Sequence, residues 1–223
     1  MALRWLSRLM DKATLADKRY AFLFEPGPPG EVVSVDCETT GLDPRRDEII
    51  SVAAIRIRGD RILASETFQS VVRPRVAIAA EAIKVHGLRE VDVANARPMS
   101  EILPDLLRFI GGRPLVGYYI DFDIAMLNNH VSELLGIHLP NPRIEVSSLY
   151  YERKYGHAPP GTQIDLTFAN ILRDLKLPLF NQHDAFSDAL MTAMIYVNLK
   201  DFLARDVRIA RPRGKPQSDY AGG

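Results

Sequence analysis

Closely spaced acids are the first feature of this sequence that could carry chemistry. Asp36 and Glu38 stand two residues apart at the end of an apolar run, residues 32–35. Because side chains alternate along a β-strand, these two carboxylates point to one face, and Cys37 points to the other. Paired carboxylates are ligands for hard divalent ions such as Mg²⁺ or Mn²⁺. A solvated strand end would carry the same pair, so the spacing alone leaves both interpretations open.

A second acidic segment follows another apolar run, residues 114–120, where a predicted strand passes into a helix. Acids near a helix N-terminus are favoured by the helix dipole and often act as caps, which is a sufficient explanation for Asp121. Asp123 precedes Ile124 and Leu127, which belong to the apolar stripe of the helix. We therefore expect Asp123 to face inward.

The third element is a histidine followed by an acid. His183 lies just before a long apolar-periodic helix, and Asp188 follows it after four residues. A lone loop histidine is usually a surface residue without a catalytic role. At this spacing, however, a histidine before a helix and an acid in its first turn can converge on one point. An inward-facing Asp188 would need a counterion.

Taken together and in this order, the motifs resemble those of the DEDDh exonucleases. That family is the RNase H-like group that includes the proofreading epsilon subunit of bacterial DNA polymerase III, RNase T and oligoribonuclease. The resemblance spans roughly residues 31–203. The motifs that carry it are Asp36-Cys-Glu38-Thr-Thr-Gly-Leu42, Phe122-Asp123 after Val116-Gly117, and His183 with four residues before Asp188.

The resemblance implies a metal-dependent hydrolysis of phosphodiester bonds. Two divalent metal ions, Mg²⁺ or Mn²⁺, would activate water and stabilise the leaving oxygen. By analogy, Asp36 would bridge the two ions, Glu38 and Asp188 would complete the shell of one, and Asp123 would hold the other largely through water. His183 would act as the base that takes a proton from the attacking water, a task suited to imidazole.

The resemblance also implies a pocket for the 3′ end of a single strand. Thr39, Thr40 and Leu42 are candidates to contact the terminal nucleotide, with Leu42 as an apolar wedge, and His86 belongs to a short segment that resembles the family's nucleotide pocket. The favoured function is a 3′-to-5′ exonuclease that releases nucleoside 5′-monophosphates from single-stranded DNA, in a replication or repair assembly. An exoribonuclease or oligoribonuclease acting on RNA would share every catalytic residue, and a non-catalytic interaction module is a further alternative.

One departure from the family concerns the second motif. Many relatives have His-Asn after its Val-Gly, whereas this chain has Tyr118-Tyr119. Either tyrosine could stack on a base or pack under the sheet, and packing is the expected role. The departure affects substrate contacts and leaves the four acids intact.

Composition sets limits on partners and location. The 223 residues carry 28 Lys plus Arg and 28 Asp plus Glu, so no overall field draws the protein onto long duplex nucleic acid. Cys37 is the single cysteine, which favours a reducing compartment. The first twenty residues lack the uninterrupted apolar core of a signal peptide, and no run is long enough to span a membrane. We expect a cytoplasmic protein without a membrane partner.

The elements that must position these residues are strands first and mainly helices afterwards. This order predicts an α/β, RNase H-like domain with a mixed five-stranded sheet, its first three strands antiparallel, flanked by helices. We expect an N-terminal helical extension at 1–30, an exonuclease domain at 31–205 and a flexible tail at 206–223. The predicted strands are 32–35, 49–58, 61–72, 114–120 and 144–146, and the predicted helices are 79–85, 100–110, 122–135, 148–154, 165–175 and 185–204.

Overall fold

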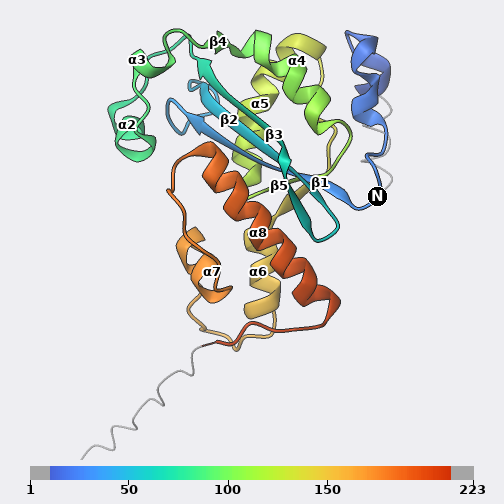
Figure 1. The fold of residues 1–223 in the computed structure, drawn as a ribbon, viewed down its shortest axis with the longest axis vertical. Helices are drawn as coiled ribbons and strands as arrows, with labels where there is room; N and C mark the ends of the chain where they lie inside the picture. The colour runs from blue at the N-terminus through green and yellow to red at the C-terminus, as the bar shows by residue number, and fades with distance from the viewer. Residues whose placement is uncertain (1–10, 212–223) are drawn as a thin grey trace, which may run out of the picture.

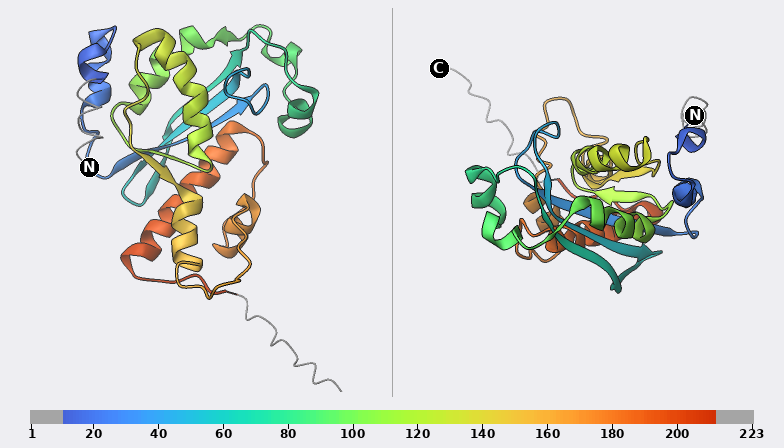
Figure 2. Two further views of the ribbon diagram at one scale, coloured as in Figure 1. Left: turned by 180° about the vertical axis from the view of Figure 1, so that it is seen from behind. Right: turned by 90° about the horizontal axis from the view of Figure 1, so that it is seen from above.

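A computed structural model describes residues 11–211 of the chain. Within these residues one mixed sheet has six strands in the order β4-β3-β2-β1-β5-β6. Helices cover both of its faces (Figures 1 and 2). The strands are β1 (Glu31–Thr39), β2 (Ile49–Arg58), β3 (Arg61–Arg73), β4 (Arg97–Pro98), β5 (Leu115–Gly117) and β6 (Arg143–Glu145). The helices are η1 (Lys18–Phe24), α2 (Ala80–His86), α3 (Glu90–Val93), α4 (Met99–Ile110), α5 (Ile120–Leu135), α6 (Val146–Lys154), α7 (Phe168–Asp174) and α8 (Ala185–Ala204).

The first three strands form the predicted antiparallel meander. β1 pairs with β2 and β2 pairs with β3, and the hairpin between the last two closes at Arg58 and Arg61 around Gly59, whose φ of 63° suits a tight turn. β5 then adds parallel to the other edge of β1, and β6 adds parallel to β5. The antiparallel order of the first three strands is therefore confirmed.

β1 is buried on both faces because each face packs against a different set of helices. Val33, Val35 and Cys37 point toward the apolar cluster that includes residues of η1, α4 and α5. Val32 belongs to the cluster on the opposite face, which draws on α6, α7 and α8. In Figure 1, α8 crosses the near face of the sheet, and Figure 2 shows α4 and α5 on the far face. The strand that carries Asp36 and Glu38 is thus the centre of the core.

Three details differ from the sequence-based expectation. The sheet has one strand more than the predicted five, because the two-residue β4 pairs with the end of β3. α4 begins at Met99, one residue before the predicted start, and its N-cap, Pro98, makes no side-chain hydrogen bond. β5 is shorter than predicted because Tyr119 adopts the left-handed conformation and the chain enters α5 at Ile120.

The segments on either side of the predicted exonuclease domain also contact the core. Tyr20, Leu23 and Phe24 are buried in the cluster of α4 and α5, and Ile209 is buried in the cluster of α6 and α8. The outer parts of the predicted extension and tail, residues 1–10 and 212–223, lie outside the described residues, and the domain boundaries stay predictions. Between residues 11 and 211, none of the helices is both long and apolar enough to cross a bilayer.

A buried hydrogen bond fixes the position of α8 on β1. The hydroxyl of Ser34 donates to the backbone carbonyl of Ala189 over 2.8 Å. Ser34 points to the same face of the strand as Asp36, and Ala189 follows Asp188 in the helix. The bond therefore sets the depth at which Asp188 lies over the strand.

We predict that Ser34→Ala lowers the free energy of unfolding by about 1 kcal/mol, the usual contribution of one buried hydrogen bond. Because α8 would lose its anchor on β1, the stabilisation of the protein by Mn²⁺ should also weaken. Chemical denaturation with and without Mn²⁺ measures both effects. Ser70→Ala is the matched control, since Ser70 on β3 bonds only to the carbonyl of its own neighbour, Val71. Equal effects of the two substitutions would contradict an anchoring role for Ser34.

Candidate active site

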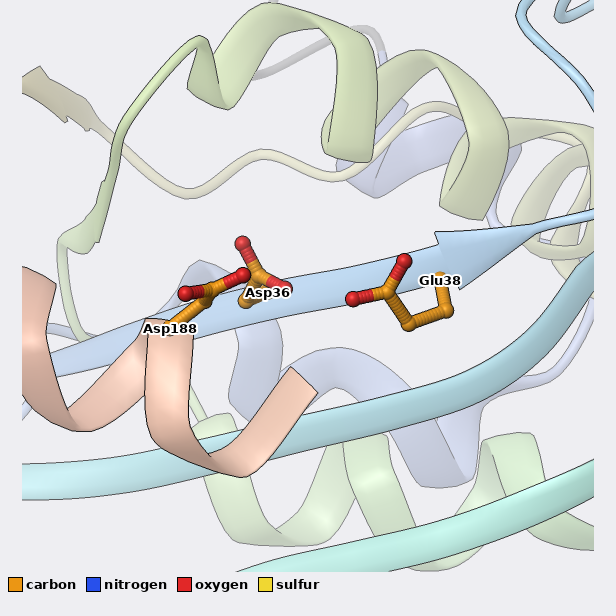
Figure 3. Close-up of side chains that lie close together, drawn as sticks. All are labelled: Asp36, Glu38 and Asp188. Carbon is orange, nitrogen blue, oxygen red and sulfur yellow. The ribbon is translucent and has the colours of Figure 1, made fainter. Parts of the chain in front are cut away.

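Three carboxylates from two elements converge at the end of β1. Oxygen atoms of Asp36, Glu38 and Asp188 all lie within 4.8 Å of one another. Figure 3 shows the carboxylate of Glu38 directed along β1 toward those of Asp36 and Asp188, the latter reaching over from the first turn of α8. The predicted alternation of the strand therefore places both of its acids on the face that α8 covers.

Asp123 reaches the same strand from the other side. β5 pairs with β1 only at Val33 and Ser34, so the edge of β1 beyond them has no strand partner there. The backbone N–H of Cys37 donates to Oδ1 of Asp123 over 3.0 Å, which satisfies that edge. Asp123 is 4% exposed, so the inward orientation predicted for it is confirmed.

Burial and mutual repulsion raise the pKa values of the acids. Burial is the largest cause at Asp36, followed by the charges of Asp123 and Asp188, and the pKa of Asp36 lies well above its usual range. Burial and the charge of Asp188 raise the pKa of Glu38 to about 7. The pKa of Asp188 is also raised, mainly by burial. Among residues 11–211, no Lys or Arg forms an ion pair with any of these acids.

His183 lies beside the acids and is held by its backbone. Its N–H donates to Oδ2 of Asp188 over 2.9 Å, while its side chain is exposed and lines the same cavity. Its φ of 63° lies in the left-handed region, which is uncommon for a residue other than glycine. The next residue, Asp184, caps α8 by accepting the N–H of Ser187. The predicted convergence of His183 and Asp188 is therefore observed through the backbone of the histidine.

One cavity of about 710 Å³ contains the acids and His183. Its volume falls within the range of small-molecule pockets, roughly 300–1,000 Å³. Its wall combines acids with aromatic and aliphatic groups. The lining residues are Asp36, Cys37, Glu38, Leu42, Tyr118, Tyr119, Asp121, Phe122, Asp123, Glu145, Ser147, Phe168, His183, Asp188 and Thr192.

Of the four expected substrate-binding residues, Leu42 lines this cavity and is 85% exposed. The side chains of Thr39 and Thr40 make internal hydrogen bonds, to the carbonyl of Gly41 and to Asp47. His86 accepts the N–H of Leu88 with Nδ1. These three residues are close to the end of β1 in the chain or in space, but they are not part of the cavity wall, and their roles stay predictions.

Two acidic residues of the site were not predicted from the sequence. Asp184 adds a further negative charge that raises the pKa values of Asp36 and Glu38. An acid just before a helix is typical of an N-cap, and this pattern alone does not indicate whether the acid also lies near a metal site. Glu145 lies in the cavity wall, where it accepts the N–H groups of Ile120 and Ser147. No local sequence pattern predicts a hydrogen bond between Glu145 and the start of a helix 25 residues earlier.

The donor set fits divalent cations. All the donors are carboxylate oxygens, the ligands that Mg²⁺ and Mn²⁺ prefer. Oδ1 of Asp188 is buried and has no hydrogen-bond partner in the described part of the chain. A cation between Asp36, Glu38 and Asp188 would satisfy this atom and neutralise the repulsion among the three groups.

The raised pKa of Glu38 predicts how stability depends on pH without metal. Its usual value is 4.5 and its value in the folded chain is about 7, so between these values the folded state holds a proton that the unfolded state has lost. Stability in EDTA should therefore fall as pH rises from about 5 to about 8. Asp36 and Asp188 act in the same direction.

Mn²⁺ should reverse this trend, because it binds the ionised form, and at a hundred times its Kd it adds about 2.7 kcal/mol. Thermal melting across this pH range, in EDTA and in Mn²⁺, measures both slopes. Glu38→Gln should flatten the slope in EDTA, and Glu101→Gln, at an exposed acid of α4, should leave it unchanged. A stability that rises with pH in EDTA would show that the acids are not mutually destabilised.

Comparisons with known proteins agree with this geometry. The RNase T family, described as Exonuclease, matches residues 33–196. The chain is 28% identical over 174 residues to the DNA polymerase III subunit epsilon of Aquifex aeolicus, a match that covers 78% of this chain and 82% of that protein. It is 27% identical over 177 residues to a PolC-type DNA polymerase III of Thermotoga maritima, covering 78% of this chain and only 12% of the polymerase.

Solved structures share the fold. Exonuclease X in complex with 5′ overhanging duplex DNA gives a TM-score of 0.61 at 20% identity, covering 78% of this chain and 93% of that chain. The zinc-bound E. coli ExoI-ssDNA complex gives 0.67 at 16% identity, covering 80% of this chain and 42% of that chain. The resemblance proposed from the sequence motifs is confirmed: this chain belongs to the RNase T family of exonucleases.

Proposed function

We propose that this protein hydrolyses the phosphodiester bond at the 3′ end of single-stranded DNA and releases nucleoside 5′-monophosphates, with two Mg²⁺ or Mn²⁺ ions. The observation that carries the proposal is the convergence of Asp36, Glu38 and Asp188 beside Asp123, in a cavity without a compensating Lys or Arg among the described residues. Such a cluster is costly unless cations occupy it, and bound cations would attract the phosphates of a nucleic acid.

Each acid has a distinct part in this proposal. When bound, the two cations supply a nucleophile at neutral pH and stabilise the charge of the leaving oxygen. Asp36 would contact both cations, and Glu38 and Asp188 would hold one of them. Asp123 has one oxygen engaged by the N–H of Cys37, which suits a ligand that acts on the other position through water.

His183 is the proposed base. Its imidazole lies in the cavity wall and is exposed, and its backbone is tied to the ligand Asp188, so the ring stays near the place where a nucleophilic water would form. Imidazole can accept the proton of that water near neutral pH. The backbone of His183 is left-handed, and its side chain lines the cavity.

DNA is the proposed substrate because the matched proteins include a DNA polymerase III subunit and exonucleases solved with DNA. The matched Aquifex protein is a DNA polymerase III subunit, and the ExoI and exonuclease X structures contain DNA. A place in a replication or repair assembly follows by the same reasoning. The single cysteine is buried and free, which fits a reducing compartment such as the cytoplasm.

The proposal predicts that 5′-labelled single-stranded DNA is shortened from its 3′ end in Mn²⁺, and that Asp36→Ala abolishes the reaction. The variant should fold, and its melting temperature in EDTA should be unchanged or higher, because the removal of one acid relieves repulsion. Gel analysis of the oligomers and thermal melting measure the two effects. Asp201→Ala, at an exposed acid of α8, is the matched control and should keep full activity.

RNA oligomers of the same lengths, assayed side by side, decide the substrate. Faster shortening of RNA than of DNA would replace the proposed substrate and keep the chemistry. If neither strand is shortened by the wild-type protein with Mn²⁺, the proposed activity is wrong. A melting temperature of Asp36→Ala in EDTA that drops well below that of the wild type would instead mark Asp36 as a structural residue.

His183→Ala should slow turnover by about 10²- to 10⁴-fold, the usual contribution of a general base, and should leave metal binding intact. The rate at saturating substrate, together with the Mn²⁺-induced rise in melting temperature, separates the two effects. His138→Ala is the matched control, since His138 is an exposed loop histidine outside the cavity. Unchanged turnover in His183→Ala would remove this residue from the role of base.

A further inference from the structure

Three aromatic rings form a continuous apolar part of the cavity wall. The ring of Tyr118 lies 4.8 Å from that of Phe168 and 4.6 Å from that of Tyr119, measured between centroids. All three line the cavity that contains the acids. Tyr118 and Phe168 are half-buried, and Tyr119 is 65% exposed.

The two neighbouring tyrosines have different surroundings. The hydroxyl of Tyr118 donates to the carbonyl of Leu166, and its ring packs on Phe168, so Tyr118 is a packing residue of the wall. The ring of Tyr119 contacts that of Tyr118, lines the cavity and is largely exposed. A large aromatic side chain that leaves this much surface in water gains little from its own fold.

The backbone of Tyr119 makes this residue type harder to explain by folding alone. Its φ of 55° and ψ of 37° lie in the left-handed region, where Gly and Asn are less strained than an aromatic residue. The turn itself is fixed by other groups, because the N–H of Ile120 donates to Oε2 of Glu145. Strained residues of this kind concentrate at functional sites.

We propose that Tyr119 is a base-stacking residue for the single strand, and that it determines how tightly the strand binds near its 3′ end. The inference rests on the proposed function, because the acids and their metals would hold the phosphates of the strand in the cavity that Tyr119 also lines. The bases of the strand would then face the aromatic wall. Stacking on a tyrosine ring is tolerant of sequence, since every base has a flat face.

The stacked base belongs to a nucleotide close to the 3′ end, because Tyr119 lines the same cavity as the acids. Leu42, 85% exposed on the same cavity, offers a second apolar contact for a base. The surface therefore provides two separate contacts for bases, and neither of them reads the sequence by hydrogen bonds.

The proposal is tested by binding and by turnover in parallel. The dissociation constant of a fluorescent DNA oligomer is measured with Ca²⁺ in place of Mn²⁺, and KM and kcat are measured with Mn²⁺. Tyr119→Ala should raise both the dissociation constant and KM by about 5- to 150-fold, the range of one base–aromatic stack, with a much smaller change in kcat. Tyr119→Phe keeps the ring and should restore most of the affinity.

A second variant separates stacking from folding. Tyr119→Asn suits the left-handed backbone, so its melting temperature should match or exceed that of the wild type, while its affinity for the oligomer should fall as in Tyr119→Ala. Leu203→Ala is the control for the loss of an exposed apolar side chain elsewhere, at 58% exposure near the end of α8. It should change neither the affinity nor KM.

Oligomers with an abasic nucleotide at successive positions from the 3′ end identify the stacked base. At one position the loss of the base should weaken wild-type binding and should have little further effect on Tyr119→Ala, because the same contact is removed twice. Additive losses at every position, or an unchanged affinity in Tyr119→Ala and Tyr119→Asn, would overturn the proposal. A wild-type protein that binds oligomers through Tyr119 but does not shorten them would contradict the proposed function alone.

Discussion

Repulsion among carboxylates is the constraint on which this structure depends. Two unit charges 4.8 Å apart repel by roughly 3–4 kcal/mol at an effective dielectric constant of about 20. Several such pairs would consume a large part of the 5–15 kcal/mol that stabilises an ordinary domain. The acids must therefore be protonated, as the raised pKa values of Asp36 and Glu38 indicate, or they must be occupied by cations. The same fold serves both states only because other contacts hold the side chains in place.

Those contacts depend on how β1 pairs with its two neighbours, antiparallel with β2 and parallel with β5. β1 pairs antiparallel with β2 along its whole length, whereas its parallel partner β5 ends early and leaves one edge of β1 open beyond Ser34. At the open edge, Asp123 accepts a hydrogen bond from the N–H of Cys37. On one face of β1, the hydroxyl of Ser34 donates a hydrogen bond to α8. One strand thus carries two acids itself and positions a third and a fourth through its backbone and its serine.

The sequence predicted most of this arrangement, because its signals were local. The spacing of Asp36 and Glu38 predicted that they share one face of a strand. The apolar stripe around Asp123 predicted its inward orientation, and the family motifs predicted that these three acids lie near Asp188. The strand β4 could not be predicted, since two residues carry no periodicity and their pairing depends on where β3 ends. The contact of Glu145 with the start of α5 is equally invisible, because it joins two distant elements through a backbone N–H.

The expected packing role of the tyrosine pair was half right for a similar reason. Tyr118 does pack, against Phe168 and Leu166. Tyr119 adopts a left-handed backbone conformation, and the residue types in this segment do not predict it. A pattern of apolar residues indicates which side chains are buried. It does not indicate which one the turn before a helix will expose.

Tyr119 and His183, the two residues of the cavity wall with a left-handed backbone, have similar positions in the fold. Each stands just before a helix, α5 or α8, and each of these helices presents an acid at its fourth residue, Asp123 or Asp188. An acid in the first turn benefits from the helix dipole, which offsets part of the repulsion at the site. The side chains of Tyr119 and His183 line the same cavity as these acids. Each helix therefore brings one acid to the cavity, and the residue with a left-handed backbone before that helix lines the same cavity.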